Sequence, residues 1–251
     1  MKKLLLTLLA VLWLTPVFAE GLSDMTDAER QTFRDEVRAY LLDNPEVLME
    51  AIKVLEGRQQ DQQAQTDEMM VVANQSAIYD DGYSYVGGNP DGDITLVEFL
   101  DYRCTYCRRA HDEVAELIKS DGNIRLVVKE FPILGEQSTL SSQLAVATLH
   151  KAGPVAYNKL GDFLMTFNGN LTPKIMTGIL TKLEVAEPED IIAYMKGDTV
   201  AQQIGATRQL ASLLKISGTP TFVIGDEMLR GYAPLKTMRE IVAYHRDQIG
   251  E

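Results

Sequence analysis

The stretch Phe99-Leu-Asp-Tyr-Arg-Cys-Thr-Tyr-Cys-Arg-Arg-Ala-His111 contains both cysteines of the 251-residue chain, Cys104 and Cys107. Residues 94–100 are mostly apolar, as in a buried strand, and after Cys104 the apolar residues recur at helical spacing. The pair is therefore expected where a strand ends and a helix begins. Unpaired N–H groups and the helix dipole favour an anion there, so we expect a thiolate to be stabilised at Cys104, with Cys107 shielded one turn further on.

Two thiols at this spacing can exchange disulfides, ligate a metal or pack in a core. A disulfide between them closes too short a loop to stabilise a fold by much. Cys104, Cys107 and His111 could supply three metal ligands, but a closed zinc site needs four. The remaining histidines, His150 and His245, are far along the chain. The spacing favours redox chemistry, in which one sulfur attacks a substrate disulfide and the other resolves the mixed disulfide. Capture of a soft metal such as Cu(I) by the two thiolates stays open as the alternative.

The first 19 residues predict a secretory signal. Lys2 and Lys3 precede an apolar run, and Val17-Phe-Ala19 supplies a cleavage site, so we expect cleavage after Ala19 and export to an oxidising compartment. Loss of the two lysines would change the formal net charge from −12 to −14. Such an acidic chain is not expected to bind nucleic acid, whose phosphates require basic patches.

Residues 20–80 are expected to form an N-terminal helical extension. Thr26 and Glu29 match a capping box, and Asn44-Pro45 indicates the start of a second helix. Steps of seven residues give a short, mostly apolar seam: Leu41, Leu48, Leu55, Gln62 and Met69. The seam is compatible with self-association through a coiled coil, and equally with an amphipathic hairpin packed on its own domain.

Residues 81–251 predict a mixed α/β domain. The order is strand, helix, strand, a helical block at about 137–216, two antiparallel strands and a final helix. The last two strands, residues 221–224 and 228–232, form a hairpin across Gly225-Asp226. We therefore expect a sheet domain interrupted by a helical insertion.

Glu98 is the one charged residue in Leu96-Val-Glu-Phe-Leu100, which is otherwise apolar on both faces. That pattern is typical of a central strand, where burial would raise the pKa of a carboxyl. We interpret Glu98 as a group that moves a proton to or from Cys107. The alternative is an acid on an edge strand that faces water.

Three separated motifs together resemble the DsbA family of thioredoxin-fold, periplasmic thiol-disulfide oxidoreductases. They are Val97 to Cys107, the helical insertion, and Ser217-Gly-Thr-Pro-Thr-Phe222. The resemblance covers about residues 84–247. It implies a thioredoxin-like α/β fold, a periplasmic location, and no cofactor or bound metal.

The resemblance also implies roles for particular residues. Cys104 would be the nucleophile, Cys107 the resolving thiol and Glu98 the proton relay. Thr219-Pro220 would be a cis peptide facing the disulfide, with the backbone of Thr219 pairing a substrate strand. The implied partners are unfolded or partly folded secreted proteins and a membrane redox partner that recharges the disulfide.

The dipeptide between the cysteines departs from the strongly oxidising members of the family. Thr105 and Tyr106, which we expect to contact substrate, stand where those members have Pro-His. Without a histidine beside the thiolate we predict a less oxidising couple, in which Arg108 and Arg109 compensate in part. Tyr106 and Thr219 resemble the disulfide isomerases and the ScsC branch, some of whose members associate through N-terminal helices. The sequence leaves the direction open between an oxidase and, for a homo-oligomer, an isomerase.

Overall fold

The computed structural model describes residues 25–250, and the chain divides into two compact units, one up to Gln59 and the other from Gln60. The first unit contains α1 (Asp27–Asp43) and the first half of α2 (Glu46–Ala73). The predicted capping box is confirmed, since the Thr26 hydroxyl accepts from the N–H of Glu29 and the Glu29 carboxylate accepts from the N–H of Thr26. Asn44, expected to open the second helix, instead ends α1 as its C-cap, and α2 begins at Glu46.

The first unit exposes most of its apolar side chains. No residue of α1 is buried, and Leu48, Ile52 and Leu55 of α2 are 46 to 55% exposed. Within this unit, a surface hollow on α1 and the start of α2 includes Phe33 and Val37. The apolar seam is thus present on the helices, and self-association through it stays a prediction.

The second unit is built on a five-stranded sheet of order β1-β3-β2-β4-β5. The strands are β1 (Tyr85–Gly88), β2 (Ile94–Leu100), β3 (Ile124–Glu130), β4 (Thr221–Ile224) and β5 (Glu227–Arg230). β2 and β3 are parallel and the other pairs are antiparallel. β2 lies at the centre of the sheet, as its apolar sequence predicts, so the edge-strand alternative for Glu98 is wrong.

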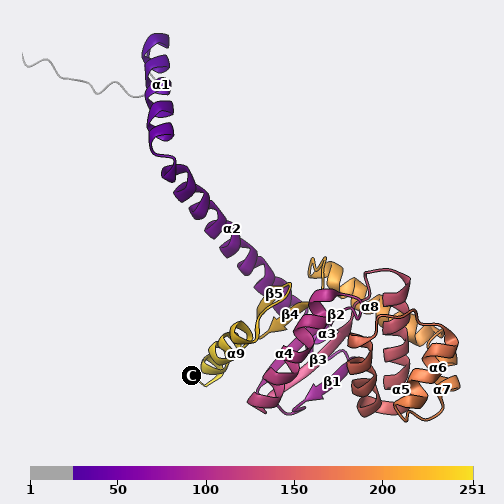
Figure 1. Ribbon diagram of the computed structural model, residues 1–251. Coiled ribbons are helices and arrows are strands. Elements are labelled where there is room, and N and C mark those ends of the chain that lie inside the picture. Colours follow the sequence, from indigo (N-terminus) through magenta and orange to yellow (C-terminus); the bar gives the residue numbers. More distant parts are fainter. Residues whose placement is uncertain (1–24, 251) are drawn as a thin grey trace, which may run out of the picture. The chain divides into compact units, whose positions relative to one another are not determined.

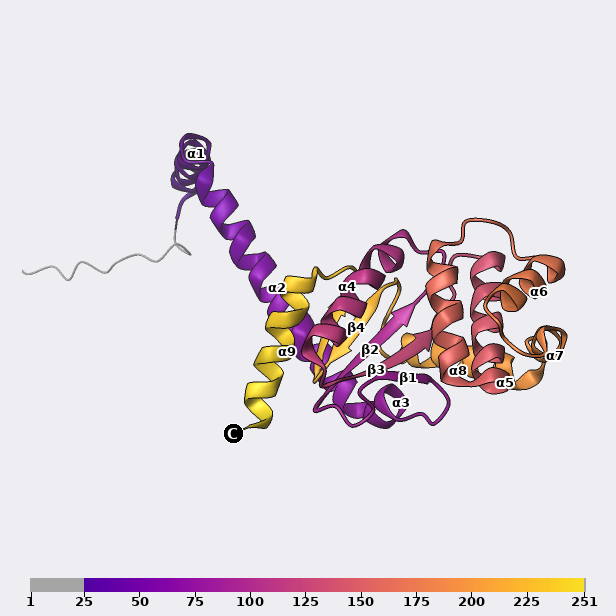
Figure 2. The ribbon, with the colours of Figure 1, turned by 60° about the horizontal axis from the view of Figure 1, so that its bottom comes forward.

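Helices cover both faces of this sheet (Figures 1 and 2). On one face, α4 (Thr105–Asp121) and α9 (Leu235–Ile249) lie side by side and pack on Leu96 and Phe222. On the other face, α3 (Gln75–Tyr79) and α8 (Asp198–Leu213) pack on Val97 and Phe99, together with the last turns of α2. The fold is thus the expected thioredoxin-like α/β sheet with flanking helices.

Residues 60–80, which the sequence analysis assigned to the extension, pack within the second unit. Val71 of α2 and Ile78 of α3 are fully buried in its core. The reason is tertiary, because the Asp67 carboxylate accepts two hydrogen bonds from Arg230 of β5, at 2.7 and 3.0 Å.

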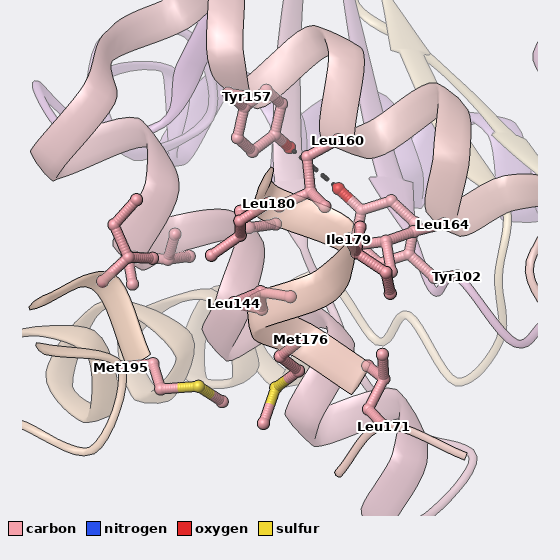
Figure 3. Packing of buried hydrophobic residues seen from close by; sticks show 14 of the residues in the cluster. Tyr102, Leu144, Tyr157, Leu160, Leu164, Leu171, Met176, Ile179, Leu180 and Met195 are labelled. Atoms are coloured by element: carbon pink, nitrogen blue, oxygen red, sulfur yellow. Dashed lines mark hydrogen bonds between the residues drawn. The ribbon is translucent and has the colours of Figure 1, made fainter. Parts of the chain in front are cut away.

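The helical insertion has a core of its own. It comprises α5 (Glu136–Thr166), α6 (Pro173–Lys182), α7 (Pro188–Tyr194) and α8. α5 is two helices that meet at Gly153, whose φ of 82° suits glycine, where Gly153-Pro154 predicted an interruption. Figure 3 shows this core, in which Leu144, Leu160 and Leu180 pack beside Tyr102 and Tyr157. Among residues 25–250 no helix is long and apolar enough to span a membrane.

Candidate active site

Cys104 is the N-cap residue of α4, as the sequence predicts. Its N–H donates to the carbonyl of Asp101, and its own carbonyl accepts the N–H of Arg108 at 3.1 Å. The side chain of Cys104 is 7% exposed, whereas Cys107, one turn into the helix, is completely buried. Both are free thiols. The two sulfurs are therefore unequal in access, as stepwise dithiol chemistry requires.

The loop before β4 completes the surroundings of Cys104. The peptide Thr219-Pro220 is cis, as the resemblance implies, and the Cys104 Sγ donates to the carbonyl oxygen of Thr219 at 3.0 Å. Thr105 and Tyr106, which follow Cys104 in the chain, begin α4 and are exposed. The fold thus brings the 104–107 and 219–220 motifs together from more than a hundred residues apart.

Glu98 and Cys107 are both buried below this surface. Burial raises the pKa of the Cys107 thiol strongly, and the charge of Glu98 raises it further. Burial likewise raises the pKa of Glu98 to about 8, with a smaller contribution from Glu130. The Glu98 Oε1 has no hydrogen-bond partner among the described residues. Cys107 cannot readily ionise by itself, and Glu98 is the carboxylate whose charge acts on its thiol.

A second buried acid, Glu130, was not singled out from the sequence. Its Oε1 accepts hydrogen bonds from the hydroxyls of Tyr102 at 2.8 Å and Tyr157 at 2.6 Å. Burial nevertheless raises the pKa of Glu130 to about 7, since it outweighs those bonds. The register pairs Leu100 with Glu130 and Glu98 with Val128, so the two acids lie on the same face of adjacent strands. Unlike Glu98, Glu130 ends a strand that also contains Arg125 and Lys129, so its sequence gave no comparable signal of a buried acid.

A cavity of about 300 Å³ connects Glu98 to the surface between α4 and α5. Leu100 and Val128 of the sheet line it beside Glu98. At its rim, His111 of α4 lies 3.0 Å from the carboxylate of Asp162 on α5, and both side chains are partly exposed. His111 is thus a helix-side residue near the site, and the cavity extends from Glu98 to partly exposed side chains.

Arginines fix the helical insertion against the cysteine motif. Arg108 donates to the carbonyls of Tyr102 and Phe167, at 2.8 and 2.6 Å, and Arg103 donates to the carbonyl of Gly169 at 2.6 Å. The sequence indicated Arg108 as a charge near the thiolate but gave no role for Arg103. The acceptors in the insertion lie about 60 residues away in the chain, so these contacts follow only from the tertiary fold.

The described residues do not favour the metal-binding alternative. Among residues 25–250 no three His, Cys, Asp or Glu side chains are grouped so that they could hold a metal ion. Cys104 and Cys107 are the only thiols in the chain, so one chain offers a soft metal at most two thiolate ligands.

A family model described as thioredoxin matches residues 80–243. The chain belongs to the thioredoxin family. A second model, described as the N-terminal domain of the copper resistance protein ScsC, matches residues 29–62. Within the thioredoxin family the chain lies in the DsbA-like group, near ScsC.

Solved structures and one curated relative agree with this placement. A thioredoxin-like oxidoreductase from Silicibacter pomeroyi DSS-3 is 33% identical, with a TM-score of 0.64 over 69% of this chain and 98% of that one. A linker-deletion mutant of Proteus mirabilis ScsC is 25% identical, with a TM-score of 0.65 over 90% of this chain and 98% of that one. Disulfide bond formation protein D of Bacillus subtilis (strain 168) is 23% identical over 62% of this chain and 73% of its own length.

The chain also matches curated Na(+)/H(+) antiporters of the NhaA type, of whose length it spans 22 to 26%.

Proposed function

We propose that this chain catalyses thiol-disulfide exchange in secreted proteins through Cys104 and Cys107. The observation that carries the proposal is the unequal placement of the two thiols. Cys104 caps α4 beside Thr219 and keeps 7% of its surface exposed, while Cys107 is fully buried with a raised pKa. Such a pair separates attack on a substrate from resolution of the mixed disulfide.

In the reductive direction the Cys104 thiolate attacks one sulfur of a substrate disulfide, and the other substrate sulfur leaves as a thiolate. The Cys107 thiol then loses its proton and attacks the Cys104 sulfur, which releases the second substrate sulfur. The product is a Cys104–Cys107 disulfide and a reduced substrate. The same steps in reverse oxidise a substrate dithiol and return the site to its two thiols.

Glu98 is the proposed acceptor of the Cys107 proton. Its pKa of about 8 leaves it near half titration under mildly alkaline conditions, and its Oε1 is unpaired and free to accept. The cavity that leads to His111 and Asp162 provides the return route for that proton to solvent.

Substrates are proposed to be unfolded or partly folded polypeptides that pair with the backbone at Thr219 beside Pro220. Thr105 and Tyr106 are both exposed, Tyr106 by 58%, and are proposed to contact the bound segment. A periplasmic location, with the signal cleaved after Ala19, and a membrane redox partner that resets the couple are part of the same proposal.

The direction is proposed to be isomerisation by a homo-oligomer joined through α1 and α2. Two observations support this: the exposed apolar residues of the first unit, and the match of residues 29–62 to the ScsC N-terminal domain. An oligomer presents several redox sites to one misfolded substrate, which favours reshuffling over one-pass oxidation.

Reactivation of a protein with scrambled disulfides tests the proposal. The mature chain, residues 20–251, is added in a glutathione buffer, with the Cys104→Ser variant as the blank. Recovery of activity means isomerisation. Fast oxidation of a reduced substrate without recovery would mean an oxidase, and absence of both reactions would overturn the proposed function.

A further inference from the structure

Three arginines adjoin the cysteine pair in the chain: Arg103, Arg108 and Arg109. None of them forms a salt bridge with a carboxylate within the described residues. This is notable in a chain of net charge −12, in which acidic partners are plentiful.

Of the other arginines in the second unit, Arg125 and Arg208 also donate to carbonyls, whereas three are paired with carboxylates. Arg230 pairs with Asp67, Arg239 with Glu116, and Arg246 with both Asp93 and Asp121. The face that carries the two cysteines and these three arginines, here called the redox face, therefore differs from the α9 and β5 side in that its arginines form no salt bridges.

Neutral acceptors hold two of the redox-face guanidinium groups in place. Arg108 and Arg103 donate to the carbonyls of Phe167 and Gly169, at the C-terminal end of α5. Carbonyl acceptors fix a guanidinium without cancelling its unit charge. Arg109 is exposed, and its Cζ lies 4.3 Å from the centre of the Tyr232 ring.

The Tyr232 ring that Arg109 contacts lies near a second aromatic ring, which belongs to the cysteine motif. The rings of Tyr232 and Tyr106 have centroids 6.5 Å apart, and Tyr106 stands between the two cysteines. Glu113, one turn along α4 from Arg109, accepts hydrogen bonds from the Tyr232 hydroxyl and the N–H of Leu235 and forms no salt bridge with Arg109. The guanidinium group of Arg109 thus lies over the ring of Tyr232, which in turn is near Tyr106 of the cysteine motif.

A segment bound at Cys104 would lie within reach of this charge. A helix rises ~1.5 Å per residue, so Arg109 begins about 8 Å along α4 from Cys104. An extended peptide advances ~3.3 Å per residue, so the side chains one or two positions from the substrate cysteine would lie within that distance of it.

We infer that the redox face selects substrate segments with acidic side chains beside the reactive cysteine. The inference rests on the proposed exchange activity and assigns its substrate preference to Arg109, with Arg103 and Arg108 contributing to the local field. It runs against the net charge of the whole chain, which by long-range attraction would favour basic segments.

Three disulfide peptides, identical except for Glu, Gln or Lys on both sides of the cysteine, test the inference. The measurement is the second-order rate constant for their reduction by the reduced full chain at low salt. We expect the Glu peptide to react fastest and the Lys peptide slowest, with about threefold between successive peptides, the size expected from one exposed ion pair. Steering by net charge alone would give the opposite order.

Matched variants separate the local charge from the total charge. Arg109→Gln should lower the Glu-to-Lys rate ratio about threefold, and Arg109→Lys should keep most of it. Arg239→Gln removes the same unit of charge from α9 and should leave the ratio unchanged. High salt should bring the wild-type ratio toward one, because the charges are exposed.

Equal rates or a Lys preference would overturn the inference while leaving the exchange activity intact. So would an Arg239→Gln variant that lowers the ratio as much as Arg109→Gln. If even the Gln peptide were not reduced, the proposed function itself would fall, and the inference with it.

Discussion

The two compact units differ in how far they bury their apolar side chains. In the second unit the central strand β2 is buried almost throughout, and Leu96, Val97 and Phe99 are completely inaccessible. In the first unit α1 buries nothing, and Leu48 and Leu55 are about half exposed. The second unit therefore supplies its own hydrophobic stabilisation and contains the proposed redox site, whereas the first gains most if its apolar face is covered by another surface.

The largest expected effect lies in the second unit alone. Cys104→Ser removes the proposed nucleophile and should slow disulfide exchange by about a thousandfold or more. The mass of the assembly, measured by sedimentation, should not change, because the substitution lies outside the first unit. Residual exchange near the wild-type rate would show that another sulfur begins the reaction.

A substitution in the first unit should leave disulfide exchange with a peptide unchanged and should impair isomerisation. Leu48→Glu combined with Leu55→Glu places two charges in the apolar seam, so we expect dissociation and about a tenfold loss in reactivation of scrambled protein. Oxidation of a reduced peptide should change little. Gln59→Glu, on the same helix but outside the seam, is the control. An unchanged mass together with unchanged reactivation would contradict the proposed role of the unit.

Glu98 should make the stability of the second unit depend on pH. Its pKa is raised from the usual 4.5 to about 8, so the folded chain holds a proton that the unfolded chain has already released. Stability should therefore fall as the pH rises from about 4.5 to about 8. Glu98→Gln removes this loss, and at pH 8 the variant should be more stable by on the order of 3 kcal/mol in denaturant unfolding. The exposed Glu240, changed to Gln, should show no such gain.

The same substitution should impair the resolving step. Without the carboxylate, release of the Cys107 proton loses its acceptor, and the exchange rate near pH 8 should fall about tenfold and lose its inflection there. A variant that gains stability but keeps the inflection would show that Glu98 is buried for another reason.

The sequence predicts those parts of the fold that depend on local patterns. The apolar run of β2 with a single acid predicted a central strand, and the change from strand to helical spacing at Cys104 predicted the N-cap. Both follow from side-chain periodicity, which is a property of a few adjacent residues.

The parts that were missed depend on distant contacts. Glu130 is recognisable as a buried site acid only when Tyr157, 27 residues away, is seen to donate to it. The end of the N-terminal extension was misplaced for the same reason. The helical pattern of α2 does not change where the helix joins the second unit, and Arg230, which binds Asp67 there, is 163 residues away in the chain. No local pattern contains such pairs.

Two neighbouring acids of α2, Asp67 and Glu68, test whether the end of this helix is packed on the second unit. Its side chain is 6% exposed and takes a bidentate contact from Arg230, so Asp67→Asn should destabilise the second unit by about 2 kcal/mol, less than for a fully buried pair because Arg230 is 30% exposed. Glu68→Gln, one exposed residue further on, should have almost no effect on the denaturant midpoint. Equal effects of the two would mean that this part of α2 is not docked.

The smallest effect is expected at the start of α1, where nothing is buried and the helix depends on its own termini. Thr26→Ala removes the hydroxyl of the capping box and should weaken the first turn by about 1 kcal/mol, seen as faster amide exchange in the full chain. Thr32→Ala, in the middle of the same helix, exchanges a poorer for a better helix former and should slow amide exchange slightly. Opposite signs for two identical changes would show that local helix energetics govern this unit, whereas a matching loss of redox activity in either variant would tie α1 to the chemistry after all.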